Sequence, residues 1–258
     1  MRTLLIIECG VLGLVVGSFL NVVIYRVPRH QSLLRPRSRC TSCEQRIRDR
    51  DNIPVLSWLL LKGRCRNCQA RISPRYPLVE FATGALFVGS AAQLGANWAL
   101  PADLVFLASV FALALIDAEH LVLPRTIIYT ALVGVSAFLL LAAAIYGEWH
   151  RFLLAVICAA SWFALFFVIN LLSPRSLGFG DVRLAPLLGL VLGWLGIRYV
   201  LLGFFLSNLI GALIVIGLIA TKRIDLNHPV PYGVFLAMGS TLTLFAGTEL
   251  LRPFQHIL

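Results

Sequence analysis

Long apolar stretches alternate with short polar ones along almost the whole 258-residue chain. Each stretch is close to 20 residues, the length that crosses a bilayer as an α-helix. The composition agrees, because only 13% of the residues are charged, against about 25% in a soluble domain. We therefore expect an all-α polytopic membrane protein with about eight transmembrane helices. The predicted spans are 3–25, 78–98, 103–118, 126–146, 152–172, 184–200, 202–221 and 232–251.

This pattern divides the chain into three parts. Residues 1–25 form a first transmembrane helix, 26–77 a basic loop with four cysteines, and 78–258 a membrane core of about seven helices. The loop carries 13 Lys and Arg residues against three acids, which equals the whole net charge of +10. Positive loops remain on the cytoplasmic side, so both termini are expected outside the cytoplasm.

The positive charge does not require a nucleic-acid partner. Attraction of the loop to anionic headgroups of the lipid bilayer explains the excess, and the sequence contains no recognisable nucleic-acid-binding motif. We expect no nucleic acid among the partners.

Four cysteines in the loop are spaced as metal ligands. Cys40-x-x-Cys43 is followed by 21 residues and then by Cys65-x-x-Cys68. Two such pairs can surround Zn²⁺ as a tetrahedron, and four thiolates leave no open position for chemistry. Disulfides are the alternative, but they are rare in a reducing compartment. The spacing favours a structural zinc site.

Two acids lie where predicted spans meet the membrane edge. Asp117 ends the third span, and Asp181 precedes the sixth. Ionisable residues at such positions are costly and usually functional. Both fall at the cytoplasmic edge of the bundle in the topology above, so the two side chains can meet. Two close carboxyls share one proton and can act as general acid and general base.

The sequence Gly178-Phe-Gly180-Asp181 favours a loop that aims the second acid. Glycine permits positive φ and a close approach of backbone to another chain. The alternative is a plain turn into a helix with Asp181 as its N-cap. Glu80 begins the second span, where it either contacts substrate in the active-site cavity or pairs with an arginine of the loop.

Several segments resemble the prepilin (type IV) leader peptidase family, a group of GxGD-type membrane aspartyl peptidases. They are Gly17-Ser-Phe-Leu-Asn21-Val-Val-Ile-Tyr25-Arg26-Val-Pro28, the four-Cys loop with Asp51-Asn52-Ile-Pro54, Tyr76-Pro77-Leu-Val-Glu80, Gly178-Phe-Gly180-Asp181-Val-Arg183 and Val230-Pro231-Tyr-Gly233. These landmarks occur in order from about residue 17 to 240. Arg125 and Arg183 stand where the family commonly has an acidic or amide residue and a lysine.

The resemblance implies an activity and two catalytic residues. It implies cleavage of the short basic leader of prepilins or pseudopilins at the cytoplasmic face of the bacterial inner membrane, with Asp117 and Asp181 as the catalytic aspartates. Many members also methylate the new N-terminus with S-adenosylmethionine, and this second activity is implied by the resemblance alone. The pathway served, type IV pilus or type II secretion, is left open.

Two other function classes fit parts of the sequence. Paired membrane acids also occur in proton-coupled transporters, although these place the acids near the midplane and here they fall at one edge. A non-enzymatic assembly factor anchored by the zinc loop leaves the aspartates unexplained.

Overall fold

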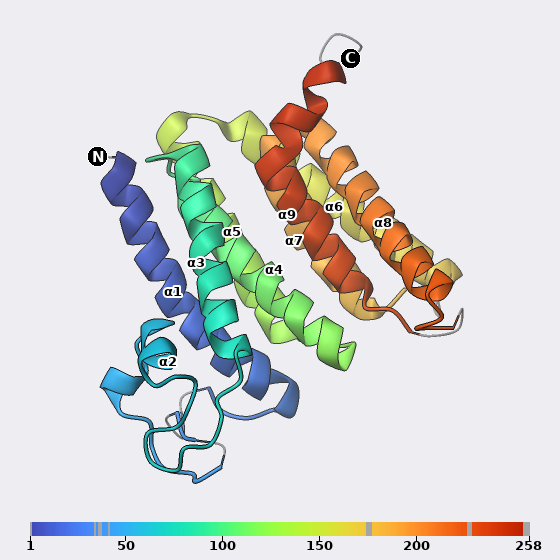
Figure 1. Ribbon diagram of the computed structural model, residues 1–258. Helices are drawn as coiled ribbons and strands as arrows, with labels where there is room; N and C mark the ends of the chain where they lie inside the picture. Colours follow the sequence, from blue (N-terminus) through green and yellow to red (C-terminus); the bar gives the residue numbers. More distant parts are fainter. Residues whose placement is uncertain are drawn as a thin grey trace. The chain divides into compact units, whose positions relative to one another are not determined.

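The computed structural model describes residues 2–33, 35, 38–40, 42–173, 177–225 and 229–254. The described chain is helical and contains no regular strand, which confirms the predicted all-α class. It divides into two compact units, Met1–Ala96 and Asn97–Leu258, which are described separately below (Figure 1).

Unit 1 contains two long helices and one short one. These are α1 (Arg2–Arg26), α2 (Leu56–Leu60) and α3 (Arg75–Leu94). Unit 2 contains the remaining helices, α4 (Leu100–His120), α5 (Arg125–Tyr146), α6 (Trp149–Leu172), α7 (Phe179–Leu195), α8 (Ile197–Ala220) and α9 (Tyr232–Leu251). Seven of the described helices, all except α2 and α7, are long and apolar enough to cross a membrane.

Helix α7 differs most from its prediction, which was a span at 184–200. The helix begins five residues earlier, at Phe179, and ends at Leu195. Gly196, with φ 131°, separates it from α8. The earlier start places Asp181 inside the first turn of α7, so the expectation that this residue precedes the helix is wrong.

In unit 1, glycines bring α1 and α3 into close contact. A Cβ placed on Gly13 would lie 2.8 Å from the Cα of Gly84, and one on Gly17 would lie 2.7 Å from the Cα of Glu80. Small residues permit such close helix packing in membrane proteins. The repeat Gly13-x-x-x-Gly17 is therefore a packing motif of this unit.

In unit 2, α7 is the central helix. Twelve of its 17 residues are buried, and it packs against each of the other five helices of the unit. Helix α6 runs along it, because Gly189 and Gly193 admit the backbone of Cys158 and Ala155 at less than 3 Å from a Cβ. The hydrophobic side chains that no other helix covers lie on the outside of the unit, mostly on α6 and α8.

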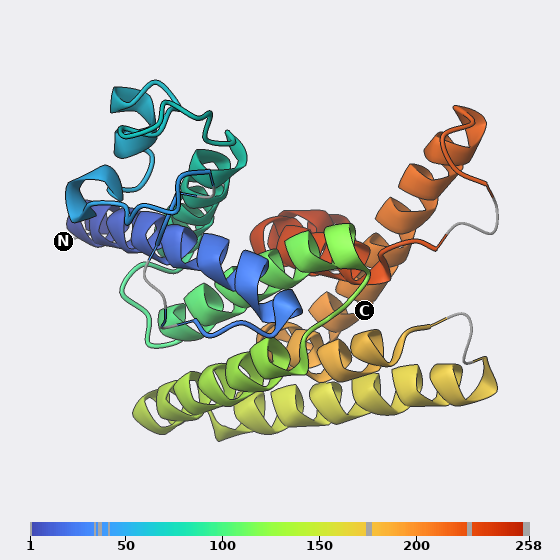
Figure 2. The ribbon, with the colours of Figure 1, turned by 90° about the horizontal axis from the view of Figure 1, so that it is seen from below.

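Helix α9 starts beside the middle of α8. Tyr232 is the first residue of α9, and its hydroxyl reaches Asn208, the twelfth of the 24 residues of α8. The second half of α8 therefore continues beyond the start of α9, as Figure 2 shows.

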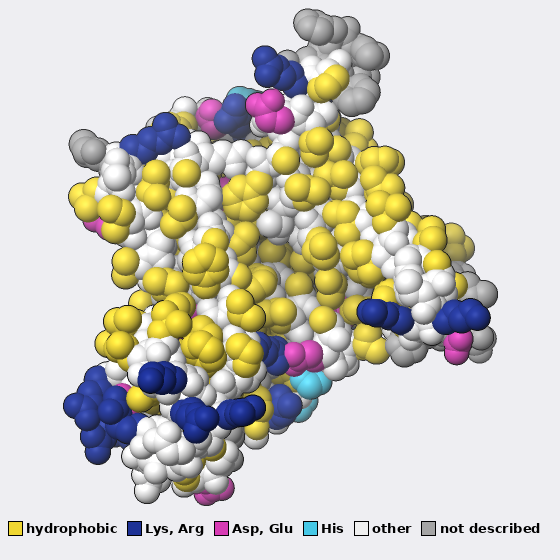
Figure 3. Space-filling view, in the orientation of Figure 1, with side chains coloured by type: hydrophobic (Ala, Val, Ile, Leu, Met, Phe, Trp, Pro, Cys, Tyr) yellow, Lys and Arg dark blue, Asp and Glu magenta, His cyan; other side chains and the backbone are white. Residues whose placement is uncertain are grey.

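The loop of unit 1 contains two similar hairpins. Bridges join Arg39 to Arg46 and Arg64 to Arg71, and each hairpin contains one Cys-x-x-Cys pair. Basic side chains gather around this loop, whereas hydrophobic side chains cover the helices (Figure 3).

Candidate active site

Two buried aspartates from different helices of unit 2 come together. Asp117 lies in the last turn of α4 and is 5% exposed, and Asp181 lies in the first turn of α7 and is 7% exposed. They are close enough for the charge of Asp117 to act on Asp181. The structure thus brings together the two acids predicted to pair, although 64 positions separate them in the sequence.

The carboxyl of Asp181 interacts with the start of its own helix. Gly178 is the N-cap of α7, and the Asp181 carboxyl lies back against it, since a Cβ placed on Gly178 would lie 3.3 Å from Oδ2 of Asp181. An acid in the third helical position often reaches back to the N-cap in this way. Asp181 therefore stabilises the helix start as well as facing Asp117, but it is not itself the N-cap.

The carboxyl of Asp117 lies against the first turn of another helix, α9. The backbone of Gly233 and Val234, in that first turn, lies beside this carboxyl. A Cβ on Gly233 would lie 2.8 Å from Oδ2 of Asp117, so only glycine allows this approach. Asp181 thus lies in the N-terminal turn of its own helix and Asp117 faces the N-terminal turn of α9, and the partial positive charge of a helix N-terminus favours a carboxylate.

Leu123 packs between these two helix starts. It follows α4 and is 7% exposed. A Cβ on Gly180 would lie 3.0 Å from its Cβ, and a Cβ on Gly233 would lie 3.0 Å from its Cδ1. One leucine thus sets the spacing between the start of α7 and the start of α9.

Each aspartate keeps one buried oxygen without a partner. Oδ2 of Asp117 and Oδ1 of Asp181 make no hydrogen bond to any described residue. Buried polar atoms are normally satisfied, and exceptions call for an explanation. These two oxygens therefore keep an unused capacity to accept a hydrogen bond.

The glycines beside Asp181 act by their small size rather than by positive φ. Gly178 has a φ of −67°, and Gly180 lies within α7 and also lacks a positive φ. Of the two properties that glycine offers here, the structure uses the close approach and not the positive φ. Gly178 has little free space, since a Cβ there would lie 3.3 Å from Oδ2 of Asp181.

Glu80 contacts the loop of unit 1. Its Oε2 accepts a 2.7 Å hydrogen bond from the backbone N–H of Val55, and the residue is 8% exposed. Val55 has a φ of 60°, a strained value for a β-branched residue. Glu80 therefore does contact the loop, as one of the two predictions for it stated. Its partner there is the backbone N–H of Val55 and not an arginine.

The four cysteines lie close enough together to share one metal ion. The Sγ atoms of Cys40, Cys43, Cys65 and Cys68 all lie within 4.8 Å of one another. The two hairpins hold them alike: the N–H of Glu44 donates to Cys40 O, and the N–H of Gln69 donates to Cys65 O.

The electrostatic surroundings of Cys40 also fit a metal site. Backbone N–H groups of Cys43 and Ser42 lower the pKa of the Cys40 thiol to about 6. A thiolate is the form that binds metal, and four sulfur donors suit Zn²⁺.

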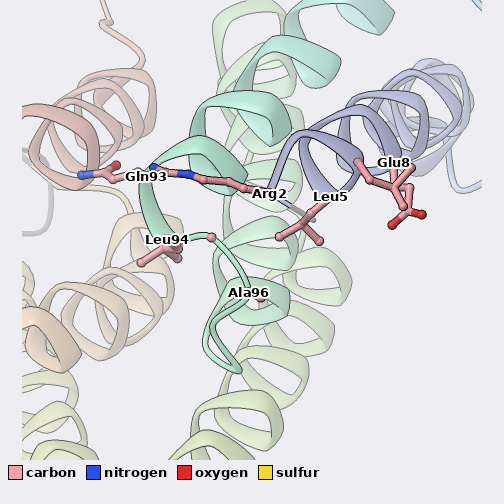
Figure 4. Close-up of a pocket in the computed structure, with 8 residues that line it drawn as sticks. Arg2, Leu5, Glu8, Gln93, Leu94 and Ala96 are labelled. Carbon is pink, nitrogen blue, oxygen red and sulfur yellow. The ribbon is translucent and has the colours of Figure 1, made fainter.

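A cavity of about 470 Å³ lies in unit 1, away from the cysteines along α1. It is formed where the start of α1 meets the end of α3 (Figure 4). Arg2 crosses toward α3 and donates to the carbonyl of Ala92, and Glu8 lines the cavity. It contains neither aspartate of the pair.

Sequence reasoning gave no role to Leu123 or to the start of α9. The only available signal was Val230-Pro231-Tyr-Gly233, which was identified as a landmark without a function. Its contact with Asp117 depends on the packing of α9 against α4.

Comparisons with known proteins agree with the site. Residues 11–94 match the model of the bacterial Peptidase A24 N-terminal domain, and residues 104–216 match that of the type IV leader peptidase family. The prepilin leader peptidase/N-methyltransferase of Aeromonas hydrophila is 35% identical, with 93% of this chain and 90% of that protein covered. The protein of the same name from Bacillus subtilis is 32% identical, with 93% and 94% covered.

No solved structure matches this chain. The two family models together match most of the sequence, and the relatives align with it nearly end to end. The chain belongs to the type IV leader peptidase family.

Proposed function

We propose that this membrane peptidase removes the leader of prepilins or pseudopilins, with Asp117 and Asp181 as its catalytic pair. The observation that carries the proposal is the meeting of two buried carboxyls, each with one oxygen that lacks a partner among the described residues. The names of the relatives supply the substrate class.

The pair can perform peptide hydrolysis without a covalent intermediate. Two adjacent carboxyls hold one proton between them. The ionised carboxylate takes a proton from water as the water oxygen attacks the scissile carbonyl, and the protonated carboxyl donates to the oxygen that becomes negative. When the C–N bond breaks, the proton held by the first carboxyl passes to the leaving amine, and the second carboxylate takes back a proton from a hydroxyl of the tetrahedral intermediate as the C=O bond re-forms. The pair then holds one proton again.

The surroundings of the pair suit this single negative charge. The N-terminus of α7 carries Asp181 and the N-terminus of α9 faces Asp117, and helix N-termini stabilise anions. Neither helix start has to move for the proton to pass from one carboxyl to the other, so the electrostatic environment is organised before substrate binds.

The site lies at the cytoplasmic edge of the inner membrane in this proposal. The support is the distribution of positive charge, with 13 Lys and Arg residues in the single loop 26–77. Four thiolates of that loop would hold Zn²⁺, which organises a loop too small to build an apolar core. S-adenosylmethionine is the proposed methyl donor for the new N-terminus, on the strength of the relatives' names.

Mass spectrometry of a co-expressed prepilin tests the proposal. The parent should release the leader, and Asp117→Asn and Asp181→Asn should each slow the release by about 10²- to 10⁴-fold, the usual contribution of a general acid or base. A product heavier by one methyl group would show the second activity.

Asp103→Asn is the matched control. Asp103 is a buried aspartate in the first turn of the same helix, α4, and lies about 21 Å along it from Asp117. This variant should cleave at the parent rate. Cleavage at the parent rate by either Asp117→Asn or Asp181→Asn, at equal membrane levels, would refute the two-aspartate mechanism.

A further inference from the structure

Tyr232 ties the first turn of α9 to the middle of α8. Its hydroxyl donates to Oδ1 of Asn208 at 3.1 Å. The orientation of the amide is fixed chemically, because its Nδ2 donates to the carbonyl of Phe204 at 2.8 Å, and a carbonyl can only accept. A polar side chain in the middle of a membrane helix is costly. Asn208 is such a residue, and its amide oxygen accepts the hydrogen bond that joins α8 to α9.

The ring of Tyr232 also packs against an aromatic side chain of α6. The ring centroid of Phe166, on α6, lies 6.4 Å from that of Tyr232. Phe166 is 1% exposed and also packs edge-on against Phe204 at 6.4 Å. Tyr232 is therefore fixed by α6 through its ring and by α8 through its hydroxyl.

This fixed residue directly precedes the two that face the catalytic pair. Gly233 and Val234, next in the chain, lie beside the carboxyl of Asp117, and a Cβ placed on Gly233 would lie 2.8 Å from its Oδ2. The phenol is also near enough to Asp181 to experience its charge. A shift of Tyr232 therefore moves the groups that orient one aspartate and changes the surroundings of the other.

We propose that Tyr232 and Asn208 are positioning residues that hold the first turn of α9 against the carboxyl of Asp117. The proposal rests on the proposed function of the aspartate pair and adds a contact from α8, a helix that carries neither aspartate. Tyr232 acts through Asp117, so its loss should change the catalytic step more than substrate binding.

The structure contains a matched control. Tyr199 on α8 and Thr248 on α9 also form a hydrogen bond between their hydroxyls, at 3.1 Å. Tyr199→Phe therefore removes a tyrosine hydrogen bond between the same two helices, 16 residues along α9 from Tyr232, or about 24 Å. If Tyr232 only fastened two helices, the two tyrosine variants would behave alike.

The test measures kcat, KM and the pH profile of leader cleavage in purified full-length protein. Tyr232→Phe and Asn208→Leu should each lower kcat by about three- to tenfold, the range of one hydrogen bond, and should leave KM nearly unchanged. The double variant should be no slower than either single variant, since both remove the same bond. The pH profile should move in these variants and remain unchanged in Tyr199→Phe.

Infrared titration of the carboxyl groups without substrate is the second measurement. The carboxyl band of Asp117 is identified as the one that is present in the parent and absent from Asp117→Asn. Its intensity is then followed against pH in the parent, Tyr232→Phe and Tyr199→Phe. Its midpoint should move only in Tyr232→Phe. If the parent fails to cleave prepilin, the proposed substrate is wrong, and the infrared comparison still decides the positioning role.

Two results would overturn the inference. One is a Tyr232→Phe variant that matches Tyr199→Phe in kcat, pH profile and infrared midpoint. The other is a double variant in which the two losses multiply, because independent effects would mean that Tyr232 and Asn208 do not act through one bond.

Discussion

Gly233 faces Asp117 at a distance that leaves no room for a methyl group. A Cβ at this position would lie 2.8 Å from Oδ2 of the carboxyl and 3.0 Å from Cδ1 of Leu123. The carboxyl and the leucine are both buried, so neither has space to retreat. The start of α9 is thereby part of the proposed catalytic site, although it supplies no side chain to the aspartate pair.

Gly233→Ala should lower the rate of leader cleavage by about 10²-fold, because displacements near 1 Å at a catalytic group have effects of that size. Gly217→Ala is the control, since Gly217 lies in α8 and has no atom within 4 Å of a Cβ. The rate is measured by mass spectrometry at matched protein levels. A fully active Gly233→Ala variant would show that the close approach is not needed for catalysis.

Purified protein should contain about one zinc ion per chain, measured by elemental analysis. A variant with Cys40→Ser and Cys43→Ser should lose the metal, because two of four ligands are gone, and a protease should then cut the loop 27–74 faster. Cys9→Ser and Cys158→Ser alter cysteines buried in helices and should keep the metal. Full zinc content in the Cys40/Cys43 variant would exclude this cluster as the site.

Glu80→Leu should loosen the loop from α3. It removes the acceptor of the Val55 N–H, and an unsatisfied buried donor costs about 1–3 kcal/mol. Hydrogen exchange at the Val55 amide should accelerate. Glu80→Gln keeps an acceptor oxygen and should change exchange less. Equal exchange in Glu80→Leu and the parent would contradict the anchoring contact.

The loop should lose stability as the pH falls below about 4. Arg66 binds Asp51 through two nitrogens at 2.7–3.1 Å and lowers the pKa of Asp51 below its ordinary value. A depressed pKa adds stability above the unfolded pKa of about 3.9, and this stability disappears as pH falls through the folded pKa. Protease sensitivity of the loop should therefore rise on acidification.

Asp51→Asn should abolish that part of the pH dependence. Asp49 is the control, because its contact with Arg46 is long, at 3.7 Å, and its side chain is 93% exposed. Exposed pairs of this kind contribute little, so Asp49→Asn should behave as the parent. An unchanged acid response in Asp51→Asn would assign the effect to other groups.

The sequence was sufficient for the features that depend on local pattern. Eight hydrophobic stretches correspond to eight long helices in the described chain, and the spacing of Cys40, Cys43, Cys65 and Cys68 predicted their meeting. The start of α7 was misplaced, because Gly178-Phe-Gly180-Asp181 reads as a polar turn until Leu123 is packed against it.

Long-range contacts account for what was missed. Gly233 is 116 positions from Asp117, and nothing in a single sequence indicates that the start of α9 closes on the end of α4. The pairing of Tyr232 with Asn208 likewise depends on α9 beginning halfway along α8, which hydropathy does not reveal.

The burial of α7 makes the depth of the proposed catalytic site independent of the thickness of the bilayer. A helix that faces acyl chains must match their length or tilt to accommodate a mismatch. Helix α7 is only about 26 Å long, and most of its residues contact other helices. The outer helices α6 and α8, with 24 residues each, respond to the acyl chains instead. Asp181 is thus held by protein neighbours, and we expect membranes of different thickness to host the same geometry of the aspartate pair.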